Sequence, residues 1–100
     1  MISKTIKLVN EHGLHMRPCM VIVDITEKFS CKIDISKDGI NWVNAKSMVH
    51  LCMIGAMCND EVTIRANGSD EVKAINSLIN LIEKGFGEII VEINNEYKNL

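Results

Sequence analysis

A histidine and an arginine lie two residues apart near the start of the chain, in Gly13-Leu14-His15-Met16-Arg17-Pro18. A neutral imidazole is a competent nucleophile near pH 7, because its unperturbed pKa is ~6.5. A guanidinium can hold phosphate oxygens through two parallel hydrogen bonds. The pair therefore predicts a site that binds an anion, and a phosphoryl group is the natural candidate.

The elements on either side of this stretch are expected to place His15 at a helix entrance. Residues 2–9 alternate, with Ile6 and Leu8 on one face, which predicts an antiparallel strand. Apolar side chains then recur at helical spacing from residue 16 to about residue 28, with Pro18 at an early position where a missing N–H costs little. Free N–H groups and the helix dipole would stabilise an anion there.

The middle of the chain predicts a hairpin and a short helix. Alternation over 31–35 and 40–44 predicts two strands joined by the turn Lys37-Asp38-Gly39. Ser47 is then well placed to cap a short second helix that Gly55 can end.

The last part of the expected fold is a strand and a third helix. Residues 62–66 alternate, and Ser69 or Asp70 is expected to cap a helix ending near Gly85. Its expected buried stripe consists of Val72, Ile75, Leu78, Ile79 and Ile82. The order β-α-β-β-α-β-α predicts an α+β open-faced sandwich, with a four-stranded antiparallel sheet and three helices on one face.

Composition and net charge argue against several classes of function. The 100 residues suit one compact domain, and a net charge of -2 gives no general attraction to nucleic acid or to an anionic membrane. No apolar run reaches the ~18 residues needed to span a bilayer, and no signal peptide opens the chain, so we expect a cytoplasmic protein. The four cysteines lack paired Cys-x-x-Cys spacing. A metal site built from His12, His15 and Cys19 lacks supporting ligand spacing, so neither a metal nor another cofactor is expected.

Several motifs together resemble those of HPr, the histidine-containing phosphocarrier of the phosphoenolpyruvate-dependent phosphotransferase system (PTS). The histidine stretch is followed in register by Asn44-Ala45-Lys46-Ser47-Met48, Ile54-Gly55 and Asn67-Gly68-Ser69-Asp70-Glu71. The resemblance covers residues 2–88 and implies the HPr-like sandwich. It divides the chain into an HPr-like domain, 1–88, and a C-terminal extension, 89–100. The apolar run at 89–93 could pair with a sheet edge, swap between two molecules or become ordered on a partner.

The resemblance also implies a role for the histidine site. His15 would take a phosphoryl group on Nδ1 from phosphorylated enzyme I and give it to an enzyme IIA, in the sugar-transport or the nitrogen-related branch. Arg17 would stabilise the phosphate. The chain would then be a phosphoryl carrier and a substrate of enzyme I, not an enzyme itself.

Ser47 carries an alternative function. In some HPr proteins the serine at this position is phosphorylated by an HPr kinase/phosphorylase, so this chain could be a regulatory binding module controlled at Ser47. Phosphate there would add roughly -1.5 to -2 of charge beside the partner-binding face. The same serine can also act simply as an N-cap.

The resemblance places partner-binding side chains on the first two helices. They are Met16, Met20, Met48 and Leu51. Methionines at helical spacing usually belong to the core, but we expect the three methionines to be partly exposed, in a patch edged by Arg17, Lys46 and His50. The sequence does not decide whether Leu51 is exposed or buried. Cys19 is expected to pack inside, although a helix N-terminus could lower the pKa of its thiol.

Overall fold

The computed structural model describes residues 1–88, and its elements follow the predicted order. They are β1 (Ile2–Lys7), α1 (Met16–Thr26), β2 (Lys32–Ser36), β3 (Val43–Asn44), α2 (Met48–Cys52), β4 (Glu61–Asn67) and α3 (Glu71–Glu83). The four strands form one antiparallel sheet in the order β1-β4-β2-β3. The predicted open-faced sandwich is therefore confirmed.

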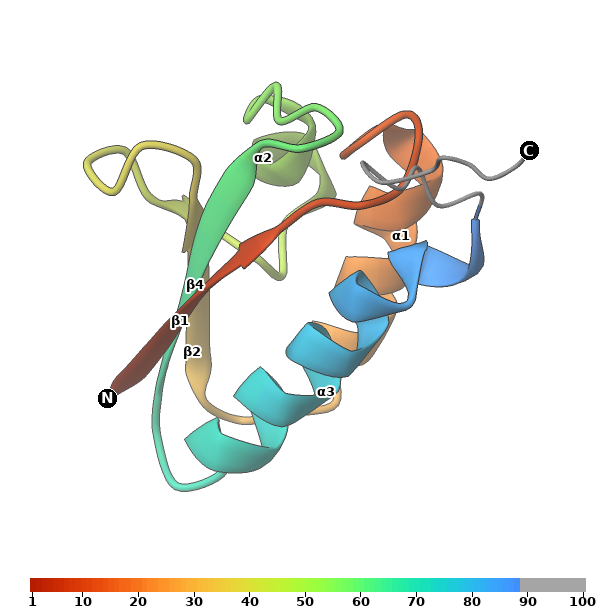
Figure 1. Ribbon diagram of the computed structural model, residues 1–100. Helices are drawn as coiled ribbons and strands as arrows, with labels where there is room; N and C mark the ends of the chain where they lie inside the picture. Colours follow the sequence, from red (N-terminus) through yellow and green to blue (C-terminus); the bar gives the residue numbers. More distant parts are fainter. Residues whose placement is uncertain (89–100) are drawn as a thin grey trace.

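The core lies between the sheet and the helices that cover one of its faces (Figure 1). Register brings Ile35 of β2 opposite Ile64 of β4, and Ile6 of β1 opposite Val62. Because strand side chains alternate between faces, one side of β2 and of β4 presents buried apolar side chains, whereas β1 and β3 contribute only partly buried ones. The largest fully buried apolar side chains are Leu8, Ile22, Ile33, Ile35, Leu51, Ile64, Ile75, Leu78, Ile82 and Val62.

The two long helices run side by side in opposite directions, so the start of α1 and the end of α3 lie at the same end of the molecule (Figure 1). After α3, the short turn Gly85–Gly87 has positive φ at all three residues, including 57° at Phe86. The Phe86 side chain is only 5% exposed. Its burial anchors a backbone conformation that is unfavourable for a residue with a side chain, and Glu88 follows at once.

The returning strand of the hairpin is shorter than predicted. We expected a strand over 40–44, whereas β3 contains only Val43 and Asn44. The Asp38 carboxylate accepts hydrogen bonds from the backbone N–H groups of Ile40 and Asn41, at 2.8 and 2.7 Å. These N–H groups are therefore held in a wide loop instead of a strand ladder.

The cap and the buried stripe of α3 also differ from the prediction. Asp70 is the N-cap residue, but its carboxylate accepts from the N–H groups of Ser30 and Cys31 and joins α3 to the start of β2. Val72 is 58% exposed, whereas the smaller Ala74 is buried. Val72 and Ile79 lie two turns apart on the same edge of the stripe, and the sheet does not cover that edge in the first turn.

The proposed extension at 89–100 lies outside the described residues. Within residues 1–88, none of the helices has the length and apolar character needed to cross a bilayer.

A substitution at Gly13 tests how tightly the loop before α1 is packed. Its φ is +61°, and a Cβ added there would lie 2.6 Å from the carbonyl oxygen of Ala56. Gly39 is also left-handed, at +77°, but an added Cβ would meet no atom within 4 Å. We expect Gly39→Ala to cost about 1 kcal/mol of unfolding free energy through strain alone. Gly13→Ala should cost about 3 kcal/mol, because the backbone must also move.

Urea unfolding of the two variants beside the unsubstituted protein measures this difference. Equal losses for the two glycines would contradict the close packing of the loop against Ala56.

Candidate functional site

His15 is the N-cap residue of α1, as predicted. Its backbone is extended, with φ -87° and ψ -172°, and its carbonyl accepts the first helical hydrogen bond from the Cys19 N–H at 3.2 Å. The N–H groups of Met16 and Arg17 therefore lie ahead of the hydrogen-bonded turns, at the positive end of the helix dipole.

The loop before the helix is fixed by backbone hydrogen bonds. The Leu14 N–H donates to the Ala56 carbonyl at 3.0 Å, and the Leu14 side chain is only 7% exposed. The His15 N–H donates to the Gly13 carbonyl at 3.0 Å. Leu14 thus points into the core, and the next side chain, His15, remains 39% exposed.

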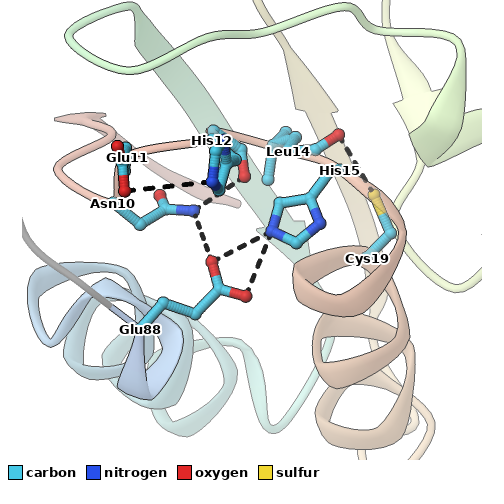
Figure 2. A network of polar contacts seen from close by, with 8 residues as sticks. Asn10, Glu11, His12, Leu14, His15, Cys19 and Glu88 are labelled. Carbon is cyan, nitrogen blue, oxygen red and sulfur yellow. Dashed lines mark hydrogen bonds and ion pairs between the residues drawn. The ribbon is translucent and has the colours of Figure 1, made fainter.

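Glu88 holds one nitrogen of the His15 ring (Figure 2). Its two carboxylate oxygens lie 3.0 and 3.1 Å from His15 Nε2. A carboxylate only accepts hydrogen bonds, so this contact favours a proton on Nε2 and a lone pair on Nδ1 when the ring is neutral. That lone pair is the nucleophile that phosphoryl chemistry at Nδ1 requires.

Asn10 supports the same carboxylate from inside the protein. It is fully buried, and its Nδ2 donates to Glu88 Oε1 at 3.1 Å and to the Gly13 carbonyl at 2.7 Å. Burial raises the pKa of the Glu88 carboxyl, but hydrogen bonds from His15 and Asn10, with the charges of His15 and Arg17, outweigh it. The net result is a lowered pKa, so Glu88 is ionised at neutral pH.

Arg17 faces an open pocket beside the histidine. Glu11, His12, Arg17 and Glu88 line this pocket, which has a volume of about 250 Å³. The His12 ring stands edge-on to the His15 ring, with 5.7 Å between centroids. The fold therefore brings His15 and Arg17 to one place, as predicted. The carboxylates of Glu11 and Glu88 lie beside them and were not predicted as site residues. In residues 1–88, no group of three or more His, Cys, Asp or Glu side chains could hold a metal ion.

The expected partial exposure is found for the three methionines, whereas Leu51 is buried. Met16 and Met20 are 67% and 53% exposed, and Met48 is half-buried. Leu51 is fully buried, because it points from the short α2 into the core, so it contributes no surface. On the same helix and just after it, Val49 and Met53 are 70% and 74% exposed, and sequence reasoning missed both.

Ser47 is the N-cap of α2, and its Oγ accepts from the His50 N–H at 3.3 Å. Lys46, expected at the edge of the patch formed by Met16, Met20 and Met48, instead donates from Nζ to the Phe29 carbonyl at 2.6 Å. That contact directs its charge toward the protein backbone.

Cys19 packs inside as expected, but its thiol is not activated. The residue has no exposed surface, and burial, with a smaller effect of the neighbouring Cys52 thiol, raises its pKa to about 12. The alternative of a thiol pKa lowered by the helix N-terminus is therefore not supported, because loss of hydration outweighs the dipole.

Asn10 and Glu88 are the site residues that sequence reasoning missed. They lie 78 positions apart, and no local spacing joins them. A signal was present in the two glycines of Gly85-Phe86-Gly87, which allow a sharp turn after α3 and so bring the next side chain back toward the start of α1.

Comparisons with known proteins agree on one family. The family model described as PTS HPr component phosphorylation site matches residues 2–84. The chain is 35% identical to phosphocarrier protein HPr of Treponema pallidum (strain Nichols), over 88% of this chain and 99% of that protein. It is 28% identical to phosphocarrier protein NPr of Klebsiella oxytoca, over 87% and 97% of the two chains. The crystal structure of HPr-C-His from Thermoanaerobacter tengcongensis superposes with a TM-score of 0.85 at 40% identity, covering 90% of this chain and all of that one.

The lowered pKa of Glu88 predicts a pH-dependent contribution to stability. A carboxyl whose folded-state pKa lies below its unfolded value stabilises the fold above the unfolded pKa, here about 4.5, and loses that contribution as the pH falls through the folded value. The stability difference between the unsubstituted protein and Glu88→Gln should therefore persist above about pH 4.5 and shrink below it.

Urea unfolding between pH 3 and pH 7 measures this difference, with Glu11→Gln as the control. The Glu11 carboxylate lies 3.8 Å from the exposed His12 ring and is half exposed. A difference for Glu88→Gln that grows as the pH falls below about 4.5 would contradict a lowered pKa for the Glu88 carboxyl.

Proposed function

The chain belongs to the HPr family of PTS phosphocarrier proteins, and we propose that its His15 accepts a phosphoryl group from phosphorylated enzyme I and passes it to an enzyme IIA. One observation carries the proposal. The His15 ring is partly exposed at the start of α1, one nitrogen faces the Glu88 carboxylate, and the other is left to react. In this role the chain is a carrier and a substrate of enzyme I.

The proposed transfer needs no cofactor on this chain. The Nδ1 lone pair attacks phosphorus, the Nδ1–P bond forms, and the bond to the donor breaks with its electron pair moving to the donor atom. The Nε2 proton stays in place and faces Glu88. When the group moves on, the leaving group is then a neutral imidazole, which makes the reverse bond cleavage accessible.

Arg17 is proposed to stabilise the phosphoryl oxygens. Its side chain is exposed and lines the pocket beside the ring. A charge-assisted hydrogen bond to phosphate contributes ~1.5 to 3 kcal/mol. Partial exposure keeps such contacts moderate, which suits a group that must leave again.

The proposed docking surface for enzyme I and enzyme IIA is the methionine patch, defined as Met16, Met20, Met48, Val49 and Met53. It lies on α1, α2 and the residue after α2, and α1 and α2 contact each other. Arg17 and His50 lie on the same two helices and are exposed. An apolar patch with basic residues beside it suits transient binding to an acidic partner surface. Assays with sugar-branch and nitrogen-branch enzyme IIA proteins would decide the branch.

Ser47 is proposed as a second modification site, for an HPr kinase/phosphorylase. One observation favours this alternative: Ser47 immediately precedes Met48 of the methionine patch. A phosphate there would place negative charge on the docking surface. ATP-dependent phosphorylation at Ser47 without acceptance of phosphate from enzyme I would favour a regulatory module over a carrier.

His15→Ala tests the acceptor directly. Incubation with phosphoenolpyruvate, Mg²⁺ and enzyme I should give the unsubstituted protein one acid-labile, alkali-stable phosphate, and His15→Ala should acquire none. His12→Ala is the matched control, because the centroid of the His12 ring lies only 5.7 Å from that of His15. Removal of this neighbouring ring should leave labelling intact. Labelling that survives in His15→Ala would refute the assignment.

Met20→Glu tests the docking surface. A negative charge on an apolar surface that faces an acidic partner should raise the KM of enzyme I for this protein roughly tenfold, while kcat changes little. Val72→Glu is the control, since Val72 is also an exposed apolar helix residue, at 58% against 53% for Met20, but lies on α3. Equal effects of the two substitutions would argue against a specific surface on α1 and α2.

A further inference from the structure

The contact between Glu88 and His15 depends on structure that is unfavourable by itself. Asn10 Oδ1 is buried and has no hydrogen-bond partner among the described residues. Such an atom is costly, and native structures rarely keep one without a reason. Phe86 holds a left-handed backbone at φ 57°, which residues with side chains seldom adopt.

The orientation of the Asn10 amide explains the unpaired oxygen. Its Nδ2 faces two acceptors, the Gly13 carbonyl and Glu88 Oε1. Turning the amide over would place Oδ1 against both acceptors and lose both hydrogen bonds. The observed orientation is therefore the favourable one, and both amide protons are used to hold the histidine loop and the carboxylate.

The unpaired Asn10 oxygen and the left-handed backbone of Phe86 both belong to residues that position Glu88. The left-handed turn at Gly85–Gly87 carries the chain back toward α1, and the buried Asn10 receives Glu88 there. The Glu88 side chain is 13% exposed, against 39% for His15. A carboxylate placed for general solubility would be solvated, whereas this one is mostly buried and faces the His15 imidazole and the Asn10 amide (Figure 2).

We infer that Glu88, held in place by Asn10, is a positioning residue that fixes the His15 ring with its proton on Nε2 and directs phosphoryl transfer to Nδ1. The predicted effect on the transfer rate rests on the proposed acceptor role of His15. The predicted position of the proton on the unphosphorylated ring does not. As phosphorus bonds to Nδ1, positive charge develops on the imidazole, and the ionised Glu88 stabilises it through the Nε2 proton. The charge and the proton stay on the ring until the phosphoryl group leaves.

Other charged groups near the ring act differently. Arg17 and Glu11 line the same pocket, and His12 stands edge-on to His15. Among the described residues, the carboxylate that contacts the His15 ring is that of Glu88. Glu11 instead lies near His12, so Glu11→Gln is a matched control that removes one nearby charge without touching the ring.

The first measurement uses the unphosphorylated full chain and does not depend on phosphoryl transfer. Long-range ¹H–¹⁵N correlation NMR in mildly alkaline buffer reports which nitrogen of His15 carries the proton. We expect Nε2–H in the unsubstituted protein and in Glu11→Gln, and an increased share of Nδ1–H in Glu88→Ala, which removes the acceptor, and in Asn10→Ala. A His15 ring that keeps the same tautomer in Glu88→Ala would overturn the inference.

The second measurement is the rate of phosphoryl acceptance from enzyme I. Glu88→Gln should lower kcat roughly tenfold, the size expected when a charge-assisted hydrogen bond becomes a neutral one, while KM stays near its original value. Glu88→Asp should recover part of the loss. A tautomer change without a kcat change would overturn the positioning role, whereas failure of the unsubstituted protein to accept phosphate would overturn the proposed function instead.

Discussion

The hydrogen bond between Glu88 and His15 Nε2 is the interaction on which the rest of the site depends. A phosphoryl carrier needs a nitrogen that can attack phosphorus and then act as a leaving group. A ring with its proton held on Nε2 meets both requirements, because Nδ1 has a lone pair before transfer and the ring leaves as a neutral imidazole afterwards. The 3.0 and 3.1 Å contacts to the two carboxylate oxygens supply that constraint. The lowered pKa of Glu88 keeps the carboxylate ionised.

The sandwich fold brings these distant residues together. Antiparallel packing of α1 and α3 places the start of one helix beside the end of the other (Figure 1). The left-handed turn at Gly85–Gly87 then returns the chain to His15, while Leu14 and the Ala56 carbonyl hold the loop from the other side. Exposure of the His15 ring therefore coexists with a hydrogen-bonded surrounding, which would limit the reorganisation needed during the proposed transfer.

Much of this arrangement could be predicted from the sequence, because its signals are local. Apolar alternation located the four strands, helical spacing located the three helices, and the cap position of Ser47 followed from its residue type. The features that escaped prediction depend on contacts between distant segments. The Asp70 carboxylate binds Ser30 and Cys31 instead of its own helix, and Asp38 shortens the hairpin. Glu88 reaches His15 and Asn10 only through the tertiary fold, and burial raises the pKa of the Cys19 thiol, an effect that local spacing does not show.

The most direct test of the central claim is the atom to which phosphorus becomes bonded. A ³¹P–¹⁵N coupling measurement on uniformly ¹⁵N-labelled protein, phosphorylated by phosphoenolpyruvate and enzyme I, identifies that atom. We expect one phosphorus coupled to Nδ1 of His15, with a proton retained on Nε2. Coupling to Nε2, or to a nitrogen of His12 or His50, would contradict the proposed role of Glu88 and His15.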